Sequence, residues 1–358
     1  MTPSLAQLAN AIGALGDPSP ELDPERCLNV IHRQAGQCQF CADSCPVAAI
    51  TLNPVPEFNA GVCLACGACV AACPSAALQG KRSALELWRE TRKATVDGTA
   101  TLVCRAVGGG PYAAVRLPCV GALPPEFLIS LVLEGVSHLI LHTANCAACP
   151  LGRCIAQTRR AIDLAADFLS QLGMALDVTL TTEVPPAAQA APSALSRRRF
   201  FASILQPTGT LSVPDHLDTF LDLGVGWRRA LLLDGLTYAA VNPVREAVIP
   251  AETGCWGVVE VSSQCIGCQM CAQFCPSGAL ATTRAEDEVT LWFNPARCTA
   301  CGLCTRVCFK HAIVLAETVD LAGLVNGQFA PLWRGRPLSN PLSSTANKAR
   351  RRPVQPAS

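Results

Sequence analysis

The sequence carries little charge and almost no charge imbalance. Only 15% of its 358 residues are Asp, Glu, Lys or Arg, and the formal net charge at pH 7 is +1. A protein that binds nucleic acid needs a basic face, which this balanced composition does not provide. We therefore expect no nucleic acid among its partners.

Signals for membrane insertion and export are also missing. No run of 18 apolar residues occurs, and the best stretch, residues 127–142, is interrupted by Glu134 and His138. Because a membrane-spanning helix needs about 20 apolar residues, we expect no transmembrane segment. Residues 1–10 contain no Lys or Arg and no long apolar core, unlike a secretory signal. The predicted location is the cytoplasm.

Recognisable catalytic motifs are absent as well. Gly108–Gly110 is followed by neither the Gly-Lys-Ser/Thr of a phosphate loop nor a G-x-G-x-x-G fingerprint, so it is interpreted as a turn. We find no Ser-His-Asp set, no paired carboxylates and no flavin, nicotinamide or molybdopterin site. We therefore assign no catalytic residue, and expect chemistry on a substrate to take place on a partner protein.

Cysteine, by contrast, is abundant and clustered. The chain has 22 cysteines, with none between Ile155 and Gly254 and none after Cys308. Disulfide scaffolds are usually short secreted chains, which this is not. Spacings of three and four residues instead bring several thiolates onto one metal centre within a tight turn. The cysteines therefore predict metal centres, and the cytoplasm would keep their thiols reduced.

The C-terminal group contains two complete C-x2-C-x2-C-x3-C runs, residues 265–275 and 298–308. Zinc is the alternative metal, but it prefers two C-x2-C pairs and would leave the third and fourth cysteines of each run unused. The pattern resembles bacterial two-cluster ferredoxins, in which three cysteines of a run hold one [4Fe–4S] cluster and the fourth binds the other. The ligand sets that this resemblance implies are Cys265, Cys268, Cys271 and Cys308, and Cys298, Cys301, Cys304 and Cys275.

The N-terminal group repeats the pattern with one defect. The run 63–73 is complete, but in the preceding run the expected first cysteine falls on Ala35. Cys27 replaces it if residues 28–37 loop out; otherwise the site is a three-iron cluster or is missing. The match between residues 73–78 and 275–280 indicates an internal duplication. The ligand sets that the resemblance implies are Cys63, Cys66, Cys69 and Cys45, and Cys38, Cys41, Cys73 and Cys27.

Local structure around these runs follows from their prolines and apolar segments. We expect each run to lead into a short helix that starts at the proline after the fourth cysteine. Brief strands are predicted at Val258–Val261 and Val289–Phe293.

Between the two groups, apolar strands alternate with longer helices. The predicted strands are 100–103, 113–117, 137–142 and 175–180, and the predicted helices are 126–134 and 155–172. Such alternation argues for a small α/β domain with a parallel sheet. Cys104, Cys119 and Cys146 follow strands, at the sheet edge where open α/β folds bind ligands.

This middle segment resembles the hydrogenase iron–sulfur (delta) subunit family, found with heterodisulfide reductases and [NiFe] hydrogenases. The resemblance is carried by residues 102–104, 115–121, 125–129 and 134–141, together with Cys146. It implies an iron–sulfur centre, a [2Fe–2S] cluster in that family, on Cys104, Cys119, Cys146 and either Cys149 or Cys154. The alternatives are structural or redox-active free cysteines, or a zinc site that uses His142.

The predicted fold class is α+β, with two ferredoxin-like dicluster modules flanking the small α/β domain. The basic stretch 196–201 resembles a twin-arginine export motif, but it is internal and is interpreted as a docking or solvated segment. Residues 215–240 are expected to be helical. The proposed divisions are an N-terminal extension (1–26), a first ferredoxin-like module (27–80), the α/β domain (98–182), a linker and helical bridge (183–250), a second ferredoxin-like module (251–318) and a basic, disordered tail (319–358).

Together these features predict a multi-cluster iron–sulfur protein that relays single electrons. The expected cofactors are three or four [4Fe–4S] clusters and one [2Fe–2S] cluster. The expected partners are a low-potential donor and a redox enzyme such as a hydrogenase, formate dehydrogenase or other molybdoenzyme, with a peripheral membrane contact left open. The alternatives are a maturation factor for a molybdoenzyme, and a thiol–disulfide enzyme that uses Cys146 and Cys149.

Overall fold

The computed structural model describes residues 17–108, 114–183, 217–222, 224–239, 248–250 and 257–337. Most of the predicted N-terminal extension, the linker after Glu183, the basic stretch 196–201 and the tail beyond residue 337 lie outside these residues. No helix in the described part of the chain is long and apolar enough to cross a membrane.

The N-terminal module, residues 17–80, consists of short elements around its cysteines. Two antiparallel pairs, β1 with β4 and β2 with β3, frame the module. Its elements are β1 (Glu21–Leu22), α2 (Leu28–Ile31), α3 (Arg33–Gly36), α4 (Phe40–Asp43), β2 (Ile50–Asn53), β3 (Val55–Phe58), α5 (Ala68–Ala72) and β4 (Leu78–Gln79).

The middle domain, residues 84–183, contains a four-stranded parallel sheet in the order β6-β5-β7-β8. Each strand and helix predicted here is observed with boundaries shifted by two residues at most. The parallel sheet expected from the sequence is therefore confirmed. The elements are α6 (Ala84–Ala94), β5 (Thr99–Cys104), β6 (Val115–Leu117), η1 (Val120–Ala122), α7 (Pro125–Leu133), β7 (His138–His142), η2 (Cys146–Ala148), α8 (Cys154–Gln171) and β8 (Asp177–Thr181).

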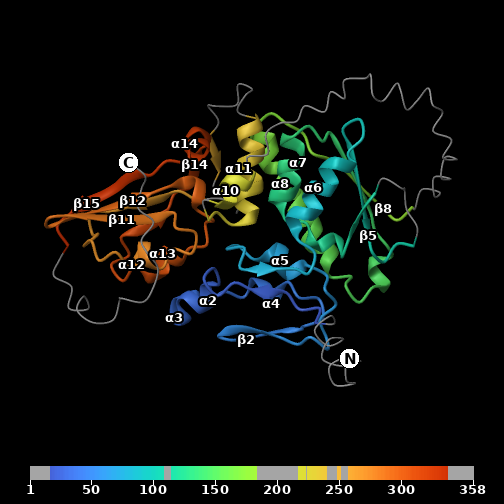
Figure 1. Ribbon diagram of the computed structural model, residues 1–358, viewed down its shortest axis with the longest axis horizontal. Helices are drawn as coiled ribbons and strands as arrows, with labels where there is room; N and C mark the ends of the chain where they lie inside the picture. Colours follow the sequence, from blue (N-terminus) through green and yellow to red (C-terminus); the bar gives the residue numbers. More distant parts are fainter. Residues whose placement is uncertain are drawn as a thin grey trace, which may run out of the picture.

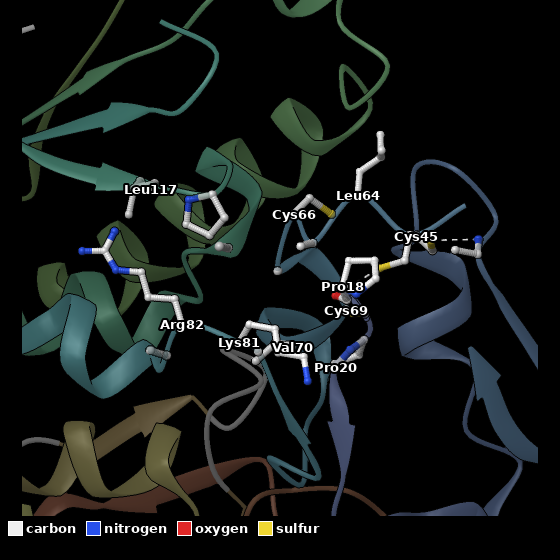
Figure 2. A pocket seen from close by; sticks show the side chains of 18 of the residues that line it. Pro18, Pro20, Cys45, Leu64, Cys66, Cys69, Val70, Lys81, Arg82 and Leu117 are labelled. Carbon is white, nitrogen blue, oxygen red and sulfur yellow. Dashed lines mark hydrogen bonds between the residues drawn. The ribbon is translucent and has the colours of Figure 1, made fainter. Parts of the chain in front are cut away.

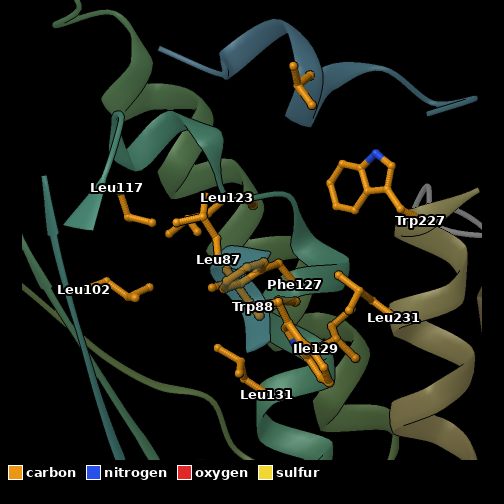
Figure 3. Close-up of a cluster of buried hydrophobic side chains, with 14 of the residues drawn as sticks. Leu87, Trp88, Leu102, Leu117, Leu123, Phe127, Ile129, Leu131, Trp227 and Leu231 are labelled. Carbon is orange, nitrogen blue, oxygen red and sulfur yellow. The ribbon is translucent and has the colours of Figure 1, made fainter. Parts of the chain in front are cut away.

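The main hydrophobic core fills the space between this sheet and its helices (Figure 3) and continues into the N-terminal module and α11. Every residue of α7 is buried, which matches its nearly continuous apolar sequence. Trp88 is fully buried and donates its indole N–H to the Ser130 hydroxyl at 2.8 Å, so its one polar atom is satisfied. The N-terminal module and the middle domain therefore share one hydrophobic core.

Two further helices, α10 (Leu217–Asp222) and α11 (Trp227–Ala239), lie at the centre of the molecule (Figure 1). The expectation of helix over residues 215–240 is confirmed for 217–222 and 227–239, whereas residues 224–226 between them are not helical. Helix α11 packs along α7 and also contacts α14 (Leu321–Asn326) of the C-terminal module. It therefore connects the middle domain to the C-terminal module.

The C-terminal module, residues 257–337, contains a three-stranded sheet, β11-β12-β15, and the pair β10–β13. The predicted strands at 258–261 and 289–293 are observed as β10 and β12. The short strand β9 (Val248–Pro250) pairs with β14. The module's elements are β10 (Val259–Val261), α12 (Met270–Gln273), β11 (Leu280–Ala285), β12 (Glu288–Phe293), η4 (Pro295–Arg297), α13 (Leu303–Val307), β13 (Ile313–Leu315), β14 (Thr318–Asp320), α14 (Leu321–Asn326) and β15 (Ala330–Gly335).

Two local predictions are wrong. Helices do not start at the proline after a run; they lie inside the runs, as α4, α5, α12 and α13. The third residue after each fourth cysteine has a positive φ, which a right-handed helix does not accommodate: Ala48, Ala76, Gly278 and His311.

The prediction of disorder from residue 319 also fails for the described part of the tail. Residues 319–337 include α14 and β15, and β15 pairs with β12 from Ala330 to Gly335. Arg334 lies within this strand and donates to the Thr290 hydroxyl. Pairing with a strand distant in sequence overrides the polar, proline-containing composition on which the prediction rested.

Candidate metal centres

The three complete cysteine runs share one backbone conformation. The residues two and four positions after the first cysteine adopt positive φ in each run: Ala65 and Gly67, Gly267 and Gln269, and Ala300 and Gly302. Non-glycine residues in this left-handed region cost about 1–2 kcal/mol each. The repetition of a costly backbone conformation indicates that the three loops are shaped to bind the same kind of group. The defective run keeps only part of the pattern, with Gln37 at φ 38°.

In the C-terminal module, the predicted cysteines fall into two groups. Cys265, Cys268, Cys271 and Cys308 line one pocket. The second group is close enough for its members to interact electrostatically, because Cys275, Cys298 and Cys301 all raise the pKa of Cys304 in addition to the effect of its burial. The structure therefore brings together the four cysteines expected for each cluster.

In the N-terminal module, Cys27 lies beside the cysteines of the defective run. A pocket is lined by Cys27, Cys38, Cys41 and Cys73. The sequence analysis expected residues 28–37 to loop out. They fold instead into the two short helices α2 and α3. Cys27 immediately precedes α2 and is only 7% exposed. These two short helices return the chain so that the displaced cysteine faces the other three.

The remaining N-terminal cysteines open onto a larger cavity of about 320 Å³ (Figure 2). Its walls include Cys45, Cys63, Cys66 and Cys69, with mostly apolar neighbours. On the far side it reaches residues 116–118 of the middle domain. The four expected cysteines therefore share one wall of a cavity at the boundary between the N-terminal module and the middle domain.

Backbone N–H groups point at several of these sulfurs. The N–H of the residue four positions after the fourth cysteine donates to its sulfur in three runs: Ala49 to Cys45 at 3.2 Å, Ala77 to Cys73 at 3.2 Å, and Ala312 to Cys308 at 3.3 Å. Such bonds stabilise a thiolate and tune the potential of an attached cluster. The sequence analysis missed these donors, although an alanine occurs at this position in all four runs.

Burial makes the metal-free thiols hard to ionise. It raises the pKa of Cys41, Cys69, Cys271 and Cys298 to about 12 in each case. Buried anionic sulfurs this close together require positive charge among them, which metal ions supply. Each pocket is lined by four cysteines, and backbone N–H groups point at several of the sulfurs. These cysteines are therefore suitable ligands for iron–sulfur clusters.

The middle domain also gathers its cysteines. Cys104, Cys119, Cys146 and Cys149 line one pocket at the end of the sheet. A hydrogen bond from Cys104 lowers the pKa of Cys119 and raises that of Cys104 itself. Between the two options left open by the sequence, this pocket favours Cys149 over Cys154.

Cys154 points elsewhere. Its side chain is 2% exposed and is hydrogen-bonded to both Cys119 and Cys66, which raises the pKa of Cys154. Gln157, one turn further along α8, donates to the carbonyls of Ala68 and Gly121 at 3.0 and 3.1 Å. Helix α8 therefore joins the middle-domain cysteines to the N-terminal module. No local sequence motif predicts this contact between distant segments.

Neither His142 nor His138 takes part in these groups. His142 is buried and is hydrogen-bonded through Nδ1 to the Glu183 carbonyl at 2.9 Å, and His138 lies 2.9 Å from the Thr179 hydroxyl. Among the described residues, no three His, Cys, Asp or Glu side chains are arranged to hold a single metal ion. The cysteines instead surround pockets.

Comparison with known proteins identifies the two cysteine modules. A family model described as 4Fe-4S dicluster domain matches residues 36–77 and 264–312. The chain is 37% identical over 72 residues to pyruvate synthase subunit PorD of Thermotoga maritima, a match that covers 19% of this chain and 70% of that protein. The chain belongs to the 4Fe-4S dicluster domain family.

Two dicluster domains imply four [4Fe–4S] clusters. Over 51 residues the chain is also 41% identical to a subunit of the ion-translocating oxidoreductase complex of Methanosarcina acetivorans, covering 14% of this chain and 18% of that relative. The chain thus spans less than a fifth of that relative's length. No solved structure matches the chain. The resemblance of the middle domain to the hydrogenase delta subunit is not among these findings.

Proposed function

We propose that this protein is an electron relay that takes single electrons from a low-potential donor and delivers them to a partner redox enzyme. The observation that carries the proposal is that the cysteine groups lie next to one another in a series through the molecule. Cys41 of one N-terminal group contributes to the raised pKa of Cys69 in the other, and Cys271 does the same for Cys304 in the C-terminal module. Adjacent groups of this kind form a path.

The ligand sets proposed for the four [4Fe–4S] clusters are those implied by the ferredoxin resemblance. A bound cluster supplies reversible one-electron storage, with a potential set by charge, hydrogen bonds and burial. The chain's own contribution is to hold the sulfurs, donate backbone N–H groups to them and exclude water. One electron leaves for each electron that enters, and in this proposal any bond of a substrate is made or broken on the partner enzyme.

Positive side chains near three of the groups support this role. Burial raises the pKa of Cys298, Cys38 and Cys301, and the positive charge of Arg229 at the first and of Arg306 at the other two opposes that rise. Hydrogen bonds from Cys104 and Cys154 lower the pKa of Cys119, and Arg105 adds to this effect. A fixed positive charge beside a cluster favours its reduced, more negative form.

The middle domain provides a proposed fifth centre. Its pocket of Cys104, Cys119, Cys146 and Cys149 is proposed to hold a [2Fe–2S] cluster, as the delta-subunit resemblance implies. Contact through Cys154 places this pocket next to the group that includes Cys66. The same resemblance supports a hydrogenase, formate dehydrogenase or other molybdoenzyme as partner. Both relatives are named as subunits of larger enzymes, one of an oxidoreductase complex and the other of a synthase.

Iron and sulfide analysis with electron paramagnetic resonance (EPR) of anaerobically purified protein, before and after dithionite, tests the proposal. About 16 irons per chain with interacting S = 1/2 signals support four [4Fe–4S] clusters, and about 18 with an additional slow-relaxing signal add the [2Fe–2S] centre. Stoichiometric zinc with little iron overturns the relay.

The maturation-factor alternative loses one of its arguments. It relied partly on the defective first run, but the pocket shared by Cys27, Cys38, Cys41 and Cys73 restores a set of four cysteines. A relay is reoxidised by its mature partner at catalytic rates, whereas a maturation factor binds the immature partner and releases the mature one. Stopped-flow reoxidation by the candidate enzyme distinguishes the two.

A further inference from the structure

The two dicluster modules meet at a small apolar cluster of their own. Leu28, Leu303 and Val307 are buried together there, at 3%, 0% and 7% exposure. Cys38 of the N-terminal module and Cys301 of the C-terminal module both pack against this cluster. The cysteine groups that contain these two residues therefore face each other across the contact.

The N-terminal side of the contact is built by residues 28–37. These residues separate Cys27 from Cys38, where a regular run would have only two residues between its first and second cysteines. Leu28 and Ile31 come from α2, Ala35 from α3, and all three belong to the apolar cluster. The ring of His32 adds an edge-on contact with Phe274 at 4.7 Å between centroids.

Arg306 fastens the contact from the other side. From α13 it donates through Nε to the Ala35 carbonyl at 2.7 Å and through Nη2 to the Gly36 carbonyl at 3.2 Å. Both carbonyls end α3 and have no partner within that short helix. The same Nη2 lies 3.3 Å from the Cys301 carbonyl, so one guanidinium is bonded to both modules.

The fit at α3 leaves little freedom. A Cβ on Gly36 would lie 2.5 Å from the Leu28 carbonyl oxygen, so α2 and α3 are packed backbone against backbone. Residues 28–37, the insertion between Cys27 and Cys38, are therefore tightly packed rather than a loosely packed loop. Its shape presents the two carbonyls that accept hydrogen bonds from Arg306.

We propose that the insertion between Cys27 and Cys38 is a docking element for the C-terminal module, and that Arg306 is the positioning residue that clamps it. The irregularity of the first run is then the feature that places one cluster of each module side by side. The inference rests on the proposed relay, because a fixed junction between the modules is what electron passage from one to the other requires.

Arg306 also connects the junction to the chemistry of both modules. Its guanidinium is bonded to the Gly36 carbonyl, two residues before Cys38, and lies 3.3 Å from the Cys301 carbonyl, so one positive charge stands beside a proposed ligand of each facing cluster. Removal of this charge disfavours the reduced form of the two facing clusters and leaves the other two unaffected. No other prediction of the relay singles out one cluster from each module.

The test compares Arg306→Gln with Lys310→Gln in the full-length, iron-loaded protein. Lys310 is an exposed cation in the same module, beside Cys308, and stacks on the Phe309 ring. Hydrogen exchange and EPR-monitored redox titration are measured for both variants. For Arg306→Gln we expect unchanged iron, at least about tenfold faster exchange of the amides of residues 28–37, and lower potentials for two of the four [4Fe–4S] clusters. For Lys310→Gln we expect neither the faster exchange nor the paired shift.

A second variant, Leu303→Ala, separates docking from charge. It removes a fully buried contact of the junction but keeps the guanidinium, so exchange of residues 28–37 should accelerate without the paired shift in potential. Unchanged exchange in both Arg306→Gln and Leu303→Ala overturns the docking element, and so does faster exchange throughout both modules with loss of iron. If the wild-type protein contains zinc instead of iron, the proposed relay is wrong. The hydrogen-exchange measurement still tests whether Arg306 holds residues 28–37 against the C-terminal module.

Discussion

Arg228 and Glu126 form a buried ion pair, with Nη2 2.9 Å from Oε2 and side-chain exposures of 12% and 6%. The Nε atom of Arg228 donates to the same oxygen at 3.1 Å, and Nη1 donates to the Cys73 carbonyl at 2.8 Å. One side chain of α11 thus joins α7 of the middle domain to a cysteine run of the N-terminal module.

We predict that Arg228→Met destabilises the protein by about 3 kcal/mol, because it leaves the Glu126 carboxylate buried without its partner. Anaerobic denaturant unfolding followed by circular dichroism measures this change. The matched control is Arg89→Ala, which breaks an ion pair with Asp218 whose side chains are 35% and 71% exposed; it should cost less than about 1 kcal/mol. Equal effects of the two variants would show that the buried pair has no special role.

Gly67 provides a test of how the cluster loop packs on the middle domain. Its φ is +80°, and a Cβ there would lie 2.8 Å from the Ala122 Cβ. We predict that Gly67→Ala lowers stability by about 2 kcal/mol or more, from backbone strain plus this clash. Gly173→Ala is the control, since Gly173 has φ +68° but nothing within 4 Å, and should show only the strain of about 1 kcal/mol. Thermal unfolding of both variants gives the comparison, and a smaller loss at Gly67 than at Gly173 contradicts it.

Cys27 can be tested as a ligand by iron counting. Cys27→Ala should lose the cluster of the first run, so that iron falls by about four atoms per chain while the other three [4Fe–4S] EPR signals persist. The reason is that Cys27 lines the same pocket as Cys38, Cys41 and Cys73. Retention of all the iron would exclude Cys27 from the ligand set.

The middle domain offers a paired test of Cys149 and Cys154. Cys149→Ala should remove about two irons, since Cys149 lines the pocket with Cys104, Cys119 and Cys146. Cys154→Ala should keep the iron but lower the potentials of the neighbouring centres, because it removes a thiol bonded to Cys66 and Cys119. The reverse pattern of iron loss would exchange the roles of the two cysteines.

Metal removal should unfold the molecule in parts. The hydrophobic cluster of the C-terminal module includes the proposed ligands Cys271, Cys298 and Cys308, whereas the residues of α7 are all buried and none of them is a cysteine. After anaerobic chelation, we expect residues 257–315 to lose protection from hydrogen exchange while 125–133 keep theirs. Simultaneous loss of protection in both segments would show that the two parts unfold as one unit.

Sequence reasoning succeeded where the signal is local. The strands and helices of the middle domain follow from apolar periodicity within each segment, and the cysteine runs follow from spacing. The alternation that predicted a parallel sheet is sufficient because strands separated by helices have few other ways to pair. These features were correct at the level of single elements.

It failed where distant segments meet. Nothing near Arg306 in the sequence indicates that its partners are the carbonyls of Ala35 and Gly36, and nothing near Cys154 points to Cys66. The pairing of β15 with β12 likewise reverses the expectation of a disordered tail. The helices inside the runs were missed because positive φ at residues such as Ala48 and Ala76 cannot be recognised from alanine itself.

The pairing of β15 with β12 has a consequence for solubility. Strand β12 is strongly apolar, with Val289, Leu291 and Phe293 buried, and β11 covers only one of its edges. Without β15, the other edge would expose a row of free N–H and C=O groups, a template on which strands of other molecules can add. A chain truncated before Ala330 should therefore aggregate through β12, even with its cysteine runs intact. On this expectation, the last described strand covers an edge that would otherwise favour self-association.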